Sequence, residues 1–246
     1  MLAMDLSIVI PAYEESRKIA RDIRSAAAFL TGNSLEGEII VVDDCSSDNT
    51  AAVARQTPVP NVVKLLSIRY EPHRGKGAAV RTGVLASTGD YVMFADSGLC
   101  VPYGNALQGI YMIRDGQCDI ANGSRKMIDS DIQQAQPLHR RACSRLFKWA
   151  VYHILNIPRH LTDTQCGFKV YRGNVARDLY ACAVTDGFMF DVEIILRAQD
   201  RGYRIEEFPV EWTCDLDSRL SLTRTPWPLI SELRRIRGTM KRERKG

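Results

Sequence analysis

The sequence lacks the cysteine pattern of a zinc-binding or disulfide-rich protein. Its seven cysteines, among 246 residues, stand singly and include no C-x-x-C pair. This distribution argues against a disulfide framework or a zinc site and favours a reducing compartment. We therefore expect a cytoplasmic protein.

Long apolar runs and internal repeats are also missing. No stretch approaches the roughly 18 residues of a membrane span, and the first residues lack the charged and apolar regions of a signal peptide. Any contact with a membrane is then expected at its surface. With 45% hydrophobic residues, the chain can bury one sizeable core, and we expect a single domain over residues 1–233.

Acidic residues are scarce near the C-terminus, where positive charge gathers. The net charge is only +4, yet residues 234–246 contain one acid, Glu243, and many basic side chains. A basic segment after the apolar residues 227–230 is typical of a lipid-surface element. A solvated tail is the alternative. A nucleic-acid-binding arm is disfavoured because no fold signature accompanies the charge.

Apolar strands alternate with amphipathic helices through the first half of the chain. The pattern predicts strands at 6–11, 38–42, 62–66 and 90–95, each followed by a helix, as at 49–56, 77–86 and 105–114. This alternation predicts an α/β fold with a mostly parallel sheet covered by helices on both faces. Beyond Gly123 we expect a long helix at 139–155, a strand at 167–171, helices near 174–182 and 191–200, and a strand at 203–212.

Carboxylates follow two of the predicted strands. Asp43 and Asp44 end one strand and Asp96 ends another, and ligands of open parallel sheets bind at this edge. Acidic strand ends are also ordinary turns and helix caps. Together, however, the two ends suit ribose hydroxyls or a metal-bridged phosphate.

A cationic loop lies between these two strand ends. Arg74, Lys76 and Arg81 surround two glycines, which lets backbone and cations approach a diphosphate. The loop is not a P-loop, and Val80 replaces the third glycine of a G-x-G-x-x-G motif.

Six blocks, in order, resemble the inverting GT-A glycosyltransferases of family 2. The resemblance is strongest to the polyprenyl-phosphate branch, the dolichyl-phosphate glucosyltransferases and mannose synthases. The blocks are residues 9–15 (VIPAYEE), 41–50 (VVDDCSSDNT), 74–83 (RGKGAAVRTG), 123–125 (GSR), 163–169 (DTQCGFK) and 190–193 (FDVE).

The resemblance implies an α/β GT-A fold, Rossmann-like, that transfers a hexose from a nucleotide sugar, UDP-glucose being the first expectation, to a lipid phosphate. Residues 1–122 would bind the donor, residues 123–233 the acceptor, and residues 234–246 would form a basic tail. The donor-binding residues implied are Pro11, Tyr13, Glu15, Asp43, Asp44, Arg74, Lys76, Asp96 and Ser97.

The chain departs from the family at its acidic signature. The family pattern Asp-x-Asp here reads Asp96-Ser97-Gly98, so Asp96 is the one metal ligand expected for Mg²⁺ or Mn²⁺, and metal dependence is doubtful. Either the ion is held mostly through the diphosphate, or Arg and Lys side chains replace it, or activity is lost.

The acceptor is expected to contact basic side chains. In the predicted helix 139–155, Arg141 and Arg145 form a basic stripe beside an apolar one, which suits a lipid phosphate, although a solvated helix face has the same pattern. Arg125 and Gln165 complete the expected acceptor site.

A prenyl monophosphate is already a nucleophile at neutral pH, so it needs positioning more than deprotonation. Asp163 and Asp191 are the candidate catalytic residues, to orient the acceptor or, for a hydroxyl acceptor, to act as base. A lipid or glycan hydroxyl as acceptor, and a non-catalytic nucleotide-sugar-binding protein, remain the alternatives. The sequence leaves the oligomeric state open.

Overall fold

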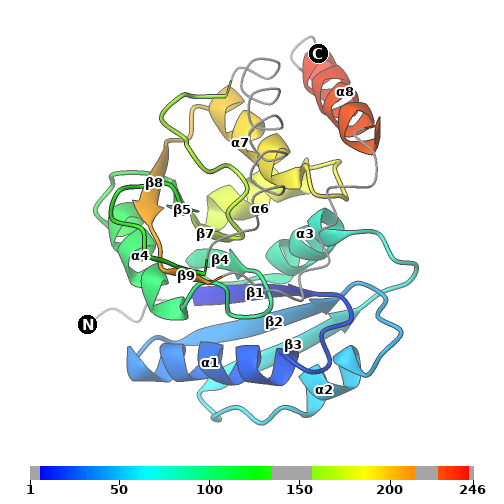
Figure 1. Ribbon diagram of the computed structural model, residues 1–246, viewed down its shortest axis with the longest axis vertical. Coiled ribbons are helices and arrows are strands. Elements are labelled where there is room, and N and C mark those ends of the chain that lie inside the picture. The colour runs from blue at the N-terminus through cyan, green and yellow to red at the C-terminus, as the bar shows by residue number, and fades with distance from the viewer. Residues whose placement is uncertain (1–5, 135–156, 214–226, 244–246) are drawn as a thin grey trace.

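A seven-stranded sheet forms the centre of the protein. The computed structural model describes residues 6–134, 157–213 and 227–243 (Figure 1). The strand order is β3-β2-β1-β4-β7-β5-β8. The strands are β1 (Leu6–Ala12), β2 (Gly37–Asp43), β3 (Val63–Arg69), β4 (Tyr91–Ala95), β5 (Ile120–Ser124), β7 (Phe168–Arg172) and β8 (Ile205–Pro209).

The predicted α/β fold is confirmed, with one reversed strand. β1, β2, β3 and β4 pair in parallel, as do β5 and β8. β7 is antiparallel to both of its neighbours, β4 and β5. Its N-terminal end therefore lies at the edge where β4 and β5 end, which brings the segment before Phe168 to the carboxyl ends of the parallel strands.

The predicted strand at 203–212 is divided. β8 ends at Pro209, and β9 (Trp212–Thr213) pairs with β6 (Ile132–Gln134) in a separate two-stranded sheet. Proline has no N–H group to donate to a ladder, so Pro209 is a suitable place for the chain to leave the main sheet.

Helices cover both faces of the sheet, as predicted. They are α1 (Ile19–Gly32), α2 (Thr50–Gln56), α3 (Lys76–Ala86), η1 (Tyr103–Asn105), α4 (Ala106–Arg114), α6 (Gly173–Ala181), α7 (Phe190–Asp200) and α8 (Trp227–Glu243). The expected helix at 139–155 lies outside the described residues.

Successive strand residues enter two separate cores. In β1, Ile8 and Ile10 pack in one core with residues of α1 and α4, whereas Val9 packs in the other with residues of α3, α6 and α7. Side chains of a strand alternate between faces, so a fully apolar strand requires helices on both sides. The unbroken apolar runs in the sequence have this cause.

The basic C-terminal segment is helical as far as it is described. Residues 234–243 belong to α8, so the expected boundary at 233/234 falls inside this helix. Ile236 and Met240 are buried in the core beside α7, and Glu243 accepts a hydrogen bond from Arg197 at 2.8 Å. Arg235 stays exposed. Within the described segments, we find no helix with the length and apolarity that crossing a bilayer requires.

Candidate functional site

The carboxyl end of β2 carries a buried carboxylate that can accept a hydrogen bond from a ligand. Asp43 has no exposed surface, and its Oδ1 accepts a hydrogen bond from the Ser46 N–H at 3.2 Å. Its Oδ2 lies 3.6 Å from Arg69 Nε and receives no hydrogen bond from the described residues. A buried carboxylate oxygen that receives no hydrogen bond from the protein suits the N–H group of a base or a ribose hydroxyl. Pro11 is buried in β1, opposite Val42.

A pair of aromatic rings lies beside this end. The Tyr13 ring is 4.4 Å from the His73 ring, and Tyr13 is 41% exposed. The two ring planes are tilted by 41°, so one ring of the pair, not both together, can stack on a planar ligand. His73 was missed in the sequence because nothing in its neighbourhood distinguishes it from a surface residue. Glu15 donates its backbone N–H to Thr50 Oγ1, and its side chain lies 4.0 Å from Lys18.

Asp44 holds the cationic loop in place. Its carboxylate accepts hydrogen bonds from the backbone N–H groups of Arg74 and Gly75, at 2.8 and 2.7 Å. Gly75 has a φ of 117°, which a residue with a side chain rarely adopts. Asp44 thus fixes the backbone from which Arg74 and Lys76 extend.

Two arginines of this loop region share one carboxylate. Asp186 lies 3.3 Å from the Arg74 guanidinium and 2.5 Å from that of Arg81. Asp186, more than a hundred residues away in sequence, was also missed. Arg74 remains partly exposed and Arg81 is less so, which leaves Arg74 the more accessible cation.

Lys76 and Asp96 form an ion pair at the centre of the site. Lys76 Nζ lies 2.6 Å from Asp96 Oδ1 and near the rings of Phe94 and Phe190. Burial disfavours the charged lysine, but the carboxylates of Asp96 and Asp191 outweigh burial and raise the pKa of Lys76.

The other oxygen of Asp96 fits against a glycine. A Cβ atom at Gly167 would lie 1.9 Å from Asp96 Oδ2, and the Asp96 N–H donates to the Gly167 carbonyl at 2.9 Å. The glycine before β7 is therefore required by the carboxylate that it touches. Ser97 follows Asp96 and is partly buried.

The missing second carboxylate has a local explanation. Gly98 has a φ of 96°, and its N–H donates to Asp22 Oδ2 of α1 at 2.7 Å. Arg21 donates to the Gly98 carbonyl at 3.0 Å. An aspartate at this position would be strained, so the loop geometry itself favours glycine.

These residues do not fit a metal ion held by protein ligands. Only Asp96 is available from the signature, and Lys76 already neutralises it. Among the described residues, no group of three His, Cys, Asp or Glu side chains is placed to hold a metal ion.

A second buried ion pair lies behind the first. Lys169 of β7 lies 2.7 Å from Asp191 Oδ1 and donates to the Cys166 carbonyl at 2.6 Å. Its Nζ is 5.2 Å from the centre of the Phe94 ring, so one ring contacts the ammonium groups of both lysines. Burial raises the pKa of Asp191, although Lys169 and Lys76 oppose this.

Arg125 and Asp163 form a two-pronged pair at the end of β5. Arg125 Nε and Nη2 donate to Asp163 at 2.7 and 2.8 Å, and the Arg125 N–H donates at 3.0 Å. Burial would raise the pKa of Asp163, but the Arg125 guanidinium holds it well below its ordinary value. Lys126 Nζ lies 3.5 Å from the same carboxylate, so two cations meet there.

Glu207 supports this pair from β8. It accepts hydrogen bonds from the Asp163 N–H and the Thr162 hydroxyl, both at 2.7 Å. Gln165 is partly buried in the segment between Asp163 and Gly167. The predicted acceptor residues Arg141 and Arg145 lie outside the described residues.

The comparisons agree with this architecture. The family described as "Glycosyl transferase family 2" matches residues 7–180. The dolichyl-phosphate beta-glucosyltransferase of Saccharomyces cerevisiae is 31% identical over 84% of this chain and 66% of its own length. That of Dictyostelium discoideum is 29% identical over 94% of this chain and 73% of its own length. This chain therefore spans about two thirds to three quarters of these two relatives.

Solved structures share the fold at low identity. Mannosyl-3-phosphoglycerate synthase from Rubrobacter xylanophilus has a TM-score of 0.70 at 16% identity, over 96% of this chain and 75% of that one. M. tuberculosis glucosyl-3-phosphoglycerate synthase, solved in complex with Mg²⁺ and uridine diphosphate, has a TM-score of 0.60 at 15% identity, over 96% and 78%. Both support the predicted GT-A fold. The chain belongs to glycosyl transferase family 2.

Proposed function

We propose that the protein transfers glucose from UDP-glucose to the phosphate of a polyprenyl lipid, with inversion at the sugar carbon. The support is twofold. Relatives that match most of the chain are named dolichyl-phosphate beta-glucosyltransferase. The carboxyl edge of the sheet carries a buried hydrogen-bond acceptor, the Asp43 carboxylate. The same edge carries a series of cations suited to two phosphorylated substrates.

The donor would lie along β1, β2 and the loop that begins α3. Its base would stack near Tyr13 and His73 and donate to Asp43, with Pro11 and Glu15 forming the pocket floor and rim. Its diphosphate would meet Arg74 and Lys76, whose loop Asp44 holds. Asp96 and Ser97 would face the sugar end of the donor.

The leaving diphosphate needs positive charge, and this chain supplies it as lysine and arginine. A positioned cation that meets developing charge is among the largest contributions to catalysis. The residues at Asp96 do not form a metal site, so we assign this role to Lys76 and Arg74. A Mg²⁺ or Mn²⁺ ion that takes part would be carried mainly by the nucleotide.

The acceptor phosphate would bind at the Arg125 and Lys126 side chains. A prenyl monophosphate is ionised at neutral pH, so its attack on the sugar carbon needs no base. Asp163 would orient Arg125, because the guanidinium fork fits the carboxylate at two points. Asp191 would act through Lys169 in the same way, and Gln165 and the Arg141 and Arg145 side chains remain predicted acceptor contacts.

In this proposal, the expected catalytic domain of residues 1–233, with its donor and acceptor halves, extends through α8 and works at the cytoplasmic surface of a membrane. The basic residues of the C-terminal segment would face the lipid headgroups. Arg235, Arg237 and Arg242 of α8 are exposed and available for this contact.

The observation that carries the proposal is a buried carboxylate oxygen at Asp43, beside the Tyr13 ring, together with a separate pair of cations at Arg125 and Lys126. The test is transfer from UDP-glucose to a short, detergent-soluble prenyl phosphate, with the matching prenyl alcohol as control acceptor. A β-glucosyl phosphate product from the first and none from the second supports the proposal. Transfer to the alcohol alone, or binding of UDP-glucose without turnover, favours a hydroxyl acceptor or a non-catalytic binding protein respectively.

A further inference from the structure

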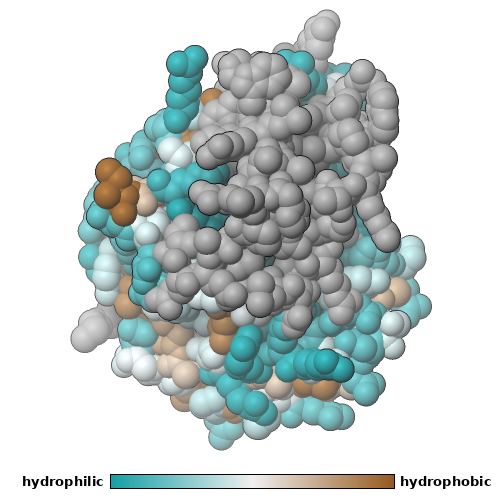
Figure 2. Space-filling model, in the orientation of Figure 1, coloured by the Kyte–Doolittle hydropathy of each residue, from teal (hydrophilic) through white to brown (hydrophobic). Residues whose placement is uncertain are grey.

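An apolar tip projects from the protein beside the proposed acceptor end. Ile128 is fully exposed and Met127 is 36% exposed, and they follow directly on Arg125 and Lys126. Figure 2 shows hydrophobic atoms standing out at the upper left of the surface, over the segment that follows β5 in Figure 1. Isolated exposed apolar residues are common, so the placement of this pair needs a further argument.

The base of this turn is held on both sides. Lys126 Nζ donates to the Thr162 carbonyl at 3.0 Å, and Ser130 Oγ donates to the Ser124 carbonyl at 2.6 Å. Within the turn, the Ser130 N–H donates to the Met127 carbonyl at 3.1 Å. The backbone therefore presents Ile128 outward from an anchored position rather than from a loose loop.

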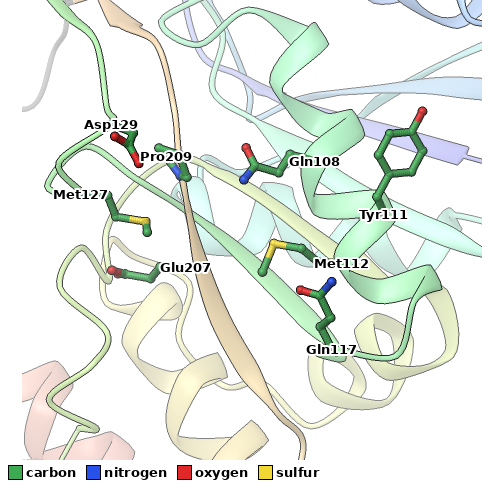
Figure 3. Close-up of a pocket in the computed structure, with 8 residues that line it drawn as sticks. All are labelled: Gln108, Tyr111, Met112, Gln117, Met127, Asp129, Glu207 and Pro209. Carbon is green, nitrogen blue, oxygen red and sulfur yellow. The ribbon is translucent and has the colours of Figure 1, made fainter.

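The surface beside the tip is mixed rather than apolar. A pocket of about 590 Å³ lies between this segment and α4 across β8 (Figure 3). Met127 and Asp129 line it from the turn, Glu207 from β8, and Met112 from α4. Two carboxylates disfavour a lipid phosphate inside the pocket, so we do not place the prenyl chain there.

We propose that the tip, residues 126–128, inserts shallowly into the surface of a lipid bilayer and so places Arg125 at the level of the acceptor phosphate. This inference rests on the proposed function. Ile128 and Met127 would enter the boundary between headgroups and acyl chains, while the Lys126 ammonium, held at Thr162 and Asp163, stays at the level of the headgroups. The substrate phosphate lies at that same level, which is where Arg125 has to meet it.

A second copy of the chain is a poorer partner for this tip. Stable protein interfaces bury about 1,200 Å² or more of surface, whereas this feature is two side chains followed by charge. A bilayer accepts a small apolar tip, because the contact needs no complementary shape.

The test compares vesicle binding of three variants of the full chain with wild type. Ile128→Asp removes the apolar tip and adds a repelling charge, and Ile128→Leu keeps the apolar character. Val62→Asp is the matched control, since Val62 is 73% exposed and precedes β3, at the opposite edge of the sheet. Sedimentation is measured with phosphatidylcholine vesicles and with vesicles that also contain phosphatidylserine, and light scattering gives the oligomeric state.

We expect Ile128→Asp to lower the vesicle partition coefficient about tenfold on both compositions, with Ile128→Leu and Val62→Asp close to wild type. Equal binding by Ile128→Asp and wild type, no vesicle binding by wild type, or a dimer that only Ile128→Asp dissociates would overturn the inference. Glucose transfer to the detergent-soluble prenyl phosphate is measured on the same samples. If wild type shows no glucose transfer, the result counts against the proposed function. If Ile128→Asp keeps glucose transfer but loses vesicle binding, the defect lies in the membrane contact.

Discussion

Lys76 Nζ lies 2.6 Å from Asp96 Oδ1, so the acidic signature of this chain holds an ammonium group. The same lysine opens α3, next to the loop that Asp44 fixes. The cation is thus attached to the protein at the point where the donor diphosphate is proposed to lie, and its charge does not depend on a bound ion.

Replacing Lys76 should therefore damage turnover more than removing metal does. Lys76→Met is expected to lower kcat roughly 100-fold, because a preorganised charge at the leaving group is lost. EDTA should have a smaller effect on wild type. Steady-state rates with UDP-glucose, with and without added Mn²⁺, check this, and Lys64→Met, at an exposed position of β3, is the control. Full rescue of Lys76→Met by Mn²⁺ would show that the ion and the lysine are interchangeable.

Asp44 should matter for donor binding rather than for folding. Asp44→Ala removes two hydrogen bonds to the loop, at Arg74 and Gly75, and hydrogen bonds to a charged group contribute about 1.5 to 3 kcal/mol each. We expect the KM for UDP-glucose to rise at least about tenfold, with the fold retained by circular dichroism. Asp90→Ala, at an exposed turn, is the control. An unchanged KM with a lower melting temperature would mean that Asp44 only caps the loop.

Replacing Arg125 should impair the use of the prenyl phosphate and spare the hydrolysis of UDP-glucose. Arg125→Ala is expected to raise the KM of the prenyl phosphate while slow hydrolysis of UDP-glucose continues, because the donor end does not contact this side chain in the proposal. Arg114→Ala, at the exposed C-terminal end of α4, is the control. If both activities fall together, Arg125 supports the fold of the site rather than the acceptor.

The free energy of unfolding should depend on pH through the ion pair between Asp163 and Arg125. The pKa of Asp163 is lower in the folded protein than its ordinary value of 3.8, so the ionised pair stabilises the fold above that pH and less as the pH falls below it. We expect Asp163→Asn to be less stable than wild type by a constant amount from pH 5 to 8, about 3 kcal/mol for a broken buried pair. Below about pH 4 the difference should shrink. Urea unfolding across this range measures it, and a difference that grows towards acid would contradict the assignment.

The sequence predicted the sheet and the strand ends because local signals specify them. Unbroken apolar runs require two covered faces, and Asp43 and Asp96 follow their strands at once. It did not predict which charges meet. Lys169 and Asp191 are 22 residues apart, and only the reversed β7 brings them together, so no spacing rule identifies them.

The C-terminal segment shows a different cause of error in sequence reading. Its many basic residues predict a lipid-surface element, with a solvated tail as the alternative, and neither interpretation includes the burial of Ile236 and Met240, which lie four residues apart on one face of α8. Because most residues of this segment are charged, its composition does not indicate that these two apolar side chains pack into the core. Asp186 likewise belongs to no motif, and it meets Arg74 and Arg81 only in the folded protein.

The role of Asp191 is best tested together with its partner. Asp191→Asn alone leaves the Lys169 ammonium buried without a counter-charge, which destabilises a protein by about 3 to 5 kcal/mol and confuses lost folding with lost chemistry. The double variant Asp191→Asn, Lys169→Met removes both charges and keeps a long side chain in the space beside Phe94.

If Asp191 only positions other groups, the double variant should turn over a prenyl phosphate at a rate closer to wild type than the single variant does. Its rate should stay nearly flat with pH above about 7, since the acceptor phosphate is already ionised. A catalytic base predicts otherwise: removing it costs roughly 100- to 10,000-fold in rate, in the double variant as in the single one. Rates of folded single and double variants between pH 5.5 and 8.5, with the Lys169→Met variant completing the cycle, distinguish these roles. A wild-type rate that rises through one ionisation and is lost in both Asp191 variants would overturn the phosphate-acceptor mechanism.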